Sequence, residues 1–426
     1  ILCLSLHERF LHPRLFTQHV SFWRNLHLGQ SNRIVAHHSW HLCNGKTMSK
    51  GSKSKIAIIG ASYLQLPLYL KAKELGIETI GFSWAIGAVA KKHCTKFYEI
   101  STTEKEQILE ICKAEKIDGI LTIATDIAVP TVNYIASKMG LIGNSQRSGL
   151  LATNKFEMRE AFKKNNINSP AFFKVSRIED LSQIENKLKY PVIVKPVDRS
   201  GSKGITKVSE QNQLKSAVVR AISEAISKTA IIEHFVVGNE ISVECISYKG
   251  QHNLLAITDK VTSGPPHFVE LEHHQPSNLS KELQTRVEQM TKAALNALEI
   301  EYGASHSEFI ITPDDVYITE VGARMGGDFI GSDLVYLSTG YDFLQGIIDI
   351  ALNQFSTPVK TKHLHSGVLF YSKSTPMLKE LTYTTSLKSK IVRSQFDENL
   401  KDDLTESSNR SGYCIYQSSE KISYFH

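Results

Sequence analysis

The chain has 426 residues, of which 41% are apolar and 22% are charged, a balance typical of a globular protein with two or three domains. Its net charge is +6, but residues 1–47 hold five basic side chains and one acidic one, so residues 48–426 are nearly neutral. This distribution argues against a broad basic face for nucleic acid. No run of about 18 apolar residues suggests a membrane span, and six cysteines without paired spacing favour a reducing, cytoplasmic compartment.

Residues 1–54 lack helical or strand periodicity. Two interpretations are open: translation begins at Met48, or the arginine-containing, acid-poor stretch before it is an organelle transit peptide. His37, His38 and His41 have no neighbouring carboxylates and are more simply read as incidental than as metal ligands. We therefore expect residues 1–54 to be an extraneous or disordered segment outside the fold.

From residue 55 onward, strands and helices alternate. The predicted strands are 55–59, 78–82 and 119–123, and the predicted helices are 64–75, 103–116 and 128–138. This order predicts a parallel sheet with crossover helices, a Rossmann-like domain over residues 55–150. The first strand is not followed by G-x-G-x-x-G, and no acidic residue ends the second, so sheet packing is favoured over a nicotinamide site.

After Asn154 hairpins replace this alternation. The predicted helices are 155–164, 211–227 and 281–298, and the predicted strands are 192–195, 230–233, 240–248, 254–259, 305–311 and 317–321. We expect an α/β first domain followed by an α+β domain over 151–355, with a small lobe in 151–235. A small α+β subdomain over 356–426 would complete the chain.

The hairpin around residue 314 carries two carboxylates. If the turn is centred on Asp314, Glu308 lies directly opposite Glu320 on one face. Two carboxylates about 5 Å apart need a cation between them or a raised pKa on one. The pattern fits Mg²⁺ or Mn²⁺ shared with nucleotide phosphates, and a solvated hairpin face is the alternative.

Three other segments could bind anions or a nucleotide. An apolar strand delivers Lys195 to a loop containing Gly201 and Gly204, whose backbone N–H groups could approach phosphate oxygens, although a turn with a surface lysine is equally consistent. The connector at 233–237 exposes backbone groups that could read an adenine edge. Arg324, in E-V-G-A-R-M-G-G-D, offers a bidentate fork for a carboxylate or acyl phosphate, or a surface ion pair.

Taken in order, these elements resemble the ATP-grasp superfamily over about residues 55–415. The resemblance extends to T-D-I-A-V-P at Thr125–Pro130 and R-S-G-Y at Arg410–Tyr413. It points to the carboxylate–amine ligase branch, which includes L-amino-acid ligases and the biotin-carboxylase-like and carbamoyl-phosphate-synthase-like proteins. The implied fold is a Rossmann-like pre-ATP-grasp domain, a two-lobed ATP-grasp domain and a small C-terminal appendage.

The resemblance implies an ATP site built from several segments. Lys155 and Lys195 would contact the phosphates, and Glu240 would bind the ribose hydroxyls. The loop closing over the phosphates would contain Ser200, Gly201, Ser202 and Gly204, and the adenine connector would contain Glu233, His234, Phe235 and Val236.

The resemblance also implies a metal site and a substrate side. Glu308 and Glu320 would hold Mg²⁺ or Mn²⁺, although Gly322 stands where many relatives have Asn. His273 could orient the amine or act as a base, or it could be a surface histidine. The implied catalytic residues are Arg324, Lys195 and Glu320, and the implied substrate residues are Glu270, His273, Arg324 and Gly327.

These expectations combine into an ATP-dependent ligase that joins a carboxylate to an amine through an acyl phosphate, releasing ADP and phosphate. The expected partners are small-molecule carboxylate and amine substrates, without nucleic acid or membrane, and the resemblance implies that the chain could form a homodimer. Three alternatives stay open: a bicarbonate-activating carboxylase or carbamoyl-phosphate-type enzyme, a non-catalytic ATP-binding protein, and a nicotinamide oxidoreductase.

Overall fold

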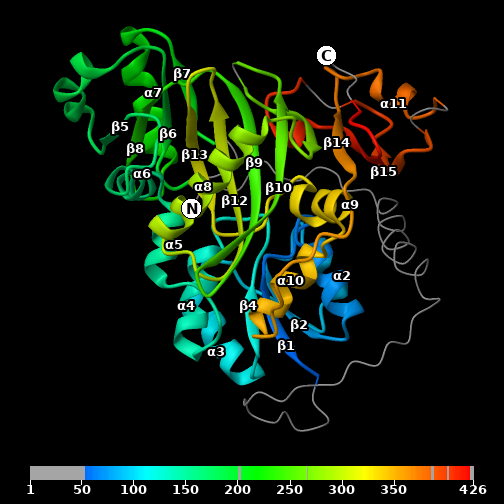
Figure 1. The fold of residues 1–426 in the computed structure, drawn as a ribbon. Helices are drawn as coiled ribbons and strands as arrows, with labels where there is room; N and C mark the ends of the chain where they lie inside the picture. The colour runs from blue at the N-terminus through cyan, green and yellow to red at the C-terminus, as the bar shows by residue number, and fades with distance from the viewer. Residues whose placement is uncertain (1–52, 200–202, 266, 385–387, 401–402, 423–426) are drawn as a thin grey trace. The chain divides into compact units, whose positions relative to one another are not determined.

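The computed structural model describes residues 53–199, 203–265, 267–384, 388–400 and 403–422, which contain three β-sheets (Figure 1). The segment before Met48 and its histidines lies outside the described residues, as do Ser200, Gly201 and Ser202. None of the described helices is both long enough and apolar enough to cross a membrane.

The first sheet is parallel, with strand order β3-β2-β1-β4. Its strands are β1 (Lys55–Ile59), β2 (Glu78–Ser83), β3 (Lys96–Glu99) and β4 (Gly119–Leu121), and its helices are α2 (Leu66–Glu74), α3 (Lys105–Glu115), α4 (Val129–Met139) and α5 (Gln146–Thr153). The predicted elements of this region are confirmed to within a few residues. Sequence reasoning missed β3 because its four residues include no buried side chain and so give no apolar run.

The second sheet is antiparallel, with strand order β5-β8-β6-β7. It comprises β5 (Phe172–Val175), β6 (Val192–Pro196), β7 (Thr206–Val208) and β8 (Ala230–His234). Helix α7 (Gln211–Glu224) packs its apolar stripe on this sheet, burying Leu214, Val218 and Ala221 in one cluster with Val194. Helix α6 (Lys155–Lys164) precedes the sheet in the chain, and its bounds match the predicted helix.

The third sheet has eight strands in the order β13-β12-β9-β10-β11-β14-β16-β15. The strands are β9 (Asn239–Tyr248), β10 (Gln251–Thr262), β11 (Glu270–Gln275), β12 (Gly303–Ile311), β13 (Val316–Gly322), β14 (His365–Tyr371), β15 (Ile391–Phe396) and β16 (Gly412–Ser418). The C-terminal strands extend this sheet, because β14 pairs with β11 (Figure 1). Helix α8 (Lys281–Ala297) buries Val287, Ala294 and Leu295 in one apolar cluster with residues of β12 and β13.

The shorter elements lie between consecutive strands of the same sheet. They are α9 (Val335–Thr339), α10 (Phe343–Ala351), α11 (Leu378–Leu381), a π-helical turn at Ile330–Leu334, and 3₁₀ turns at Val89–His93, Ile178–Gln183, Glu185–Lys187 and Ser407–Asn409. Helix α10 links the first and third sheets by packing on β4, where a Cβ on Gly119 would stand 2.7 Å from the Ala351 carbonyl oxygen. This close approach requires glycine at position 119.

Candidate functional site

A cavity of about 540 Å³ lies where the three sheets contribute side chains. The loop after β4 supplies Asp126, strand β6 supplies Lys195, and the β12–β13 hairpin supplies Glu308 and Glu320. The cavity therefore gathers the residues that the sequence pattern singled out from separate parts of the chain.

The predicted pairing of Glu308 with Glu320 is confirmed. Next to the turn, however, the pairing differs by one residue from the predicted register, because Ile311 pairs with Val316. A β-bulge then leaves Thr319 without a partner and brings the two glutamates opposite each other. The Thr319 hydroxyl donates to the Glu308 carbonyl oxygen (3.1 Å), which fixes the bulge beside the pair.

Each of these glutamates is bound to a lysine. Glu308 lies 2.7 Å from the Lys260 ammonium, and Glu320 lies 2.9 Å from that of Lys155. Burial opposes ionisation of Glu308, but Lys260 and His306 hold its pKa well below the ordinary range. The charge of Glu308 is thus balanced by neighbouring cations, and the pKa of this residue is not raised.

The carboxylate pair suits a hard cation that also binds phosphate oxygens. Among the described residues, no group of three or more histidine, cysteine or acidic side chains could hold a metal by itself. Two facing carboxylates in a cavity lined with lysines fit Mg²⁺ or Mn²⁺, because such ions usually complete their coordination with water and phosphate.

Lys155 and Lys195 are both buried and both line the cavity, at 5% and 8% exposure. Lys155 begins helix α6, which Asn154 caps by accepting bonds from the Phe156 and Glu157 amides. Burial would lower the pKa of Lys155, but Glu320 raises it. Burial outweighs Glu233 at Lys195 and lowers its pKa, although the two side chains are 2.7 Å apart.

The residues of the predicted adenine connector do not line the cavity. The carboxylate of Glu233 is buried, 2.8 Å from Arg159 and 2.7 Å from Lys195, and so serves as an internal counter-ion. Arg159 was missed by sequence reasoning, since an arginine in the middle of an amphipathic helix normally faces solvent. Glu240 lines the cavity, whereas the connector residues Glu233, His234, Phe235 and Val236 are not among the lining residues.

Ser200, Gly201 and Ser202 of the glycine loop lie outside the described residues, but the two residues that follow them are described. Lys203 lines the cavity, and Gly204 is buried at φ +73°. An added Cβ at position 204 would stand 2.9 Å from Pro196 Cγ, so the turn needs glycine both for its conformation and for space.

Arg324 is held by the first domain. Its guanidinium lies 2.8 Å from Asp126, in the T-D-I-A-V-P segment, and the neighbouring Ala124 amide donates to the Met325 carbonyl (3.1 Å). Asp126 also fills the space beside Gly322, where a Cβ would stand 2.7 Å from Asp126 Oδ1 and 3.0 Å from Arg324 Cζ. An asparagine would not fit at position 322 without moving this ion pair.

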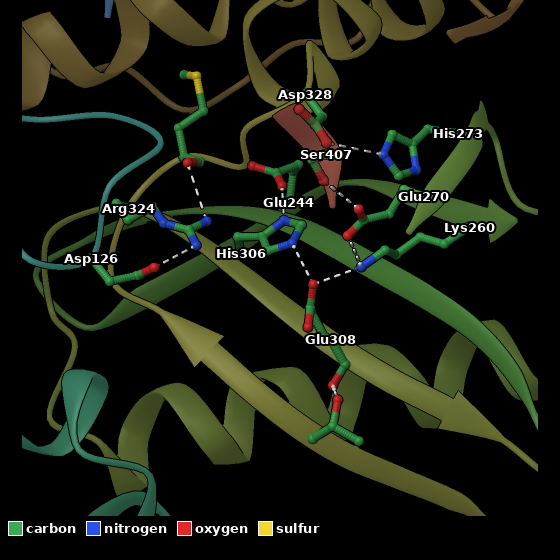
Figure 2. Close-up of polar contacts among 12 residues, drawn as sticks. Asp126, Glu244, Lys260, Glu270, His273, His306, Glu308, Arg324, Asp328 and Ser407 are labelled. Atoms are coloured by element: carbon green, nitrogen blue, oxygen red, sulfur yellow. Dashed lines mark hydrogen bonds and ion pairs between the residues drawn. The ribbon is translucent and has the colours of Figure 1, made fainter. Parts of the chain in front are cut away.

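A buried histidine, absent from the sequence-based predictions, lies beside Glu308. His306 bonds through Nδ1 to Glu244 and lies 3.4 Å through Nε2 from Glu308 (Figure 2). Burial alone would lower the pKa of His306, but Glu244 raises it to about 8. The sequence signal that could have identified His306 was the H-S-E spacing, which puts His306 and Glu308 on one face of a strand. The pairing of His306 with Glu244 across β12 and β9 could not be read locally.

The predicted substrate residues lie together on β11 and the loop after β13. Glu270 bonds to Arg410 (3.0 Å) and approaches Lys260 (3.8 Å). His273 is 1% exposed, so the surface alternative is wrong, and its Nε2 lies 4.0 Å from Asp328. Gly327, like Arg324, lines the cavity near them. Asp328 and Arg410, which bond to each other at 2.8 Å, are additions that sequence reasoning did not assign.

Comparison with known proteins identifies the central domain. The family model for the ATP-grasp domain matches residues 188–333. A D-alanine–D-alanine ligase of Flavobacterium johnsoniae is 30% identical over 199 residues, covering 44% of this chain and 61% of the relative. This alignment therefore spans less than two thirds of that ligase.

Two further comparisons cover more of the chain. A formate-dependent phosphoribosylglycinamide formyltransferase of Methanocaldococcus jannaschii is 26% identical over 342 residues, covering 76% of this chain and 81% of the relative. The crystal structure of an L-amino acid ligase from Bacillus licheniformis superposes with a TM-score of 0.70 at 23% identity, covering 87% of this chain and 95% of that one. This chain therefore contains an ATP-grasp domain and has the fold of the ATP-grasp enzymes.

Proposed function

We propose that the protein is an ATP-dependent ligase that phosphorylates a carboxylate and transfers the resulting acyl group to an amine, releasing ADP and phosphate. The observation that carries the proposal is the cavity in which Lys155 and Lys195 lie near the facing pair Glu308 and Glu320. The names of the relatives, an amino-acid ligase and a D-alanine–D-alanine ligase among them, support a reaction of this class.

The lysines and the arginine would act mainly through charge. Lys155 and Lys195 are buried cations that would neutralise the phosphate oxygens, and Lys203 would add a third positive charge from the glycine loop. Arg324, fixed by Asp126, would stabilise the acyl phosphate through its planar fork. Glu240 would bind the ribose hydroxyls.

Glu308 and Glu320 would hold Mg²⁺, which when bound would neutralise phosphate charge and orient the phosphoryl group for transfer. Each carboxylate is now paired with a lysine, Glu308 with Lys260 and Glu320 with Lys155. His306 and Glu244 would hold Glu308 in place from behind. His273, whose pKa burial lowers, would be neutral near pH 7 and able to accept a proton from the amine.

The proposal predicts that Lys195→Met abolishes ATP turnover. Purified protein is mixed with Mg²⁺ and ATP, and phosphate release is measured with amino acids singly, in pairs, and with bicarbonate. We expect release with a carboxylate–amine pair and a loss of at least about 100-fold in Lys195→Met, since a buried charge that meets the transferred phosphoryl group is removed.

Lys174→Met is the matched control, because Lys174 is an exposed lysine on β5 of the same sheet, and it should turn over ATP at the wild-type rate. Full activity in Lys195→Met would contradict the proposal. ATP binding without release in any mixture would instead support a non-catalytic protein, and release with bicarbonate alone would support a carboxylase-type reaction.

A further inference from the structure

One part of the cavity is acidic. We name as the acidic subsite the group formed by Glu270, His273 and Asp328, which lie together on one side of Glu308 (Figure 2). Lys155 and Lys195, the lysines proposed to meet phosphate, line the same cavity. The cavity thus combines lysines suited to triphosphate with carboxylates suited to a positively charged group.

One arginine bridges the two carboxylates of the subsite. Arg410 donates to Asp328 (2.8 Å) and to Glu270 (3.0 Å), and its guanidinium lies 3.7 Å above the ring of Phe370. The arginine side chain is 8% exposed, whereas each carboxylate is 27% exposed. Arg410 is therefore more buried than the two carboxylates, which both line the cavity.

The backbone at Asp328 has a strained conformation. Asp328 has φ +47° and Phe329 has φ +66°, two successive side-chain-bearing residues in the left-handed region. Such conformations persist where surrounding contacts hold them, and they concentrate at ligand sites. Here the conformation directs the Asp328 carboxylate to Arg410 and the cavity rather than to solvent.

A second observation points to a ligand in the subsite. His273 lines the cavity and is 1% exposed, yet its Nδ1 has no hydrogen-bond partner among the described residues. A buried ring nitrogen without a partner is costly unless a bound group or water satisfies it. The other ring nitrogen, Nε2, lies 4.0 Å from the Asp328 carboxylate.

We propose that the acidic subsite binds the ammonium group of a small acceptor amine that carries no phosphate, with Asp328 as a specificity-determining residue. This inference rests on the proposed function. Ionised carboxylates accept hydrogen bonds from an ammonium group, whereas a phosphorylated amine would bring more negative charge next to two fixed carboxylates. Lys260 and Arg410, the cations bonded to the subsite, are already paired with acidic side chains.

The test is binding, measured by calorimetry in the presence of Mg²⁺ and ADP. The probes are L-alanine, L-serine, L-lysine and ethanolamine, with O-phospho-L-serine and phosphoethanolamine as the phosphorylated counterparts of serine and ethanolamine. We expect at least one unphosphorylated amine to bind wild-type protein, and neither phosphorylated counterpart to bind within tenfold of its parent. Asp328→Asn should weaken the bound amine by about tenfold to a hundredfold, as expected for a charged hydrogen bond.

Asp403→Asn is the matched control, because Asp403 is an exposed partner of Lys373 and should leave amine binding unchanged. ATP affinity should be the same in all three proteins, which verifies folding. The inference is overturned if no probe binds wild-type protein, if phosphorylated amines bind as tightly as their parents, or if Asp328→Asn has no effect.

The outcome can be separated from that of the proposed function. Amine binding that depends on Asp328 without any ATP-driven phosphate release would refute the ligase and retain the subsite. Phosphate release that requires a phosphorylated amine would retain the ligase and refute the subsite.

Discussion

Gly322 leaves a space that the side chain of Asp126 occupies. Position 322 has no room for the asparagine of many relatives, because the Asp126 carboxylate occupies the space and bonds to Arg324. The glycine is therefore part of an arrangement in which Asp126, from the first domain, and Arg324 are held together.

We predict that Gly322→Asn lowers the free energy of unfolding by about 1–3 kcal/mol, because the added atoms collide with Asp126 and Arg324. The measurement is urea unfolding of the wild type, Gly322→Asn, Asp126→Ala and the double variant. The double variant should lose less stability than the sum of the two single losses, since Asp126→Ala makes room for the asparagine. Additive losses would show that the two positions do not compete for space.

At the scale of elements, one acidic residue joins strands and a helix of the first sheet. Glu115, at the end of α3, accepts bonds from Lys96 (2.8 Å) and Tyr98 (2.6 Å) on β3 and from Lys55 (3.4 Å) on β1. These contacts, chiefly that from Lys96, lower the pKa of Glu115 to about 2. The ionised carboxylate therefore stabilises the packing of this helix end against two strands.

The stability that Glu115 contributes should depend on pH in one direction. Because its folded pKa is lowered, the contribution is complete above the ordinary pKa near 4.5 and is lost as the pH falls through about 2. We expect Glu115→Gln to cost about 1 kcal/mol at pH 7, a modest value because Lys96 is half exposed. Chemical unfolding of both proteins at pH 7 and at pH 2 tests this, and an equal difference at both pH values would contradict it.

At the scale of the whole described chain, the candidate site depends on all three sheets. Asp126 follows a strand of the first sheet, Lys195 lies on the second and Glu308 on the third. Arg410, which bonds to Glu270, lies in the segment before β16. A nucleotide bound between Lys195 and the β12–β13 hairpin would touch two sheets at once. Binding should therefore stabilise the assembled arrangement of sheets as well as the local loops.

We predict that Mg²⁺ and ATP raise the thermal unfolding midpoint of the wild type by a few degrees. At a ligand concentration of 100 times Kd, the stabilisation is about 2.7 kcal/mol. Differential scanning fluorimetry of the wild type, Lys195→Met and Lys174→Met would measure the shift, which we expect only Lys195→Met to lose. An undiminished shift in Lys195→Met would place the nucleotide away from β6.

The sequence by itself determined the local elements and part of the site. Short apolar runs predicted β1, β2 and β6, and the helical pattern after Asn154 predicted α6. These signals could be recognised because they depend on residues close together in the chain. The hairpin likewise brought Glu308 and Glu320 together from within thirteen residues, and even an unforeseen bulge at Thr319 preserved the pair.

Only the tertiary structure decided which charges meet. Arg324 bonds to Asp126, Lys155 to Glu320, and Arg410 to Glu270, each pair joining residues more than 130 positions apart. No local periodicity encodes such contacts, because they depend on how the sheets pack and on which strands become neighbours. For the same reason the sequence suggested a metal between two repelling glutamates, whereas the fold also supplied a lysine partner for each of them.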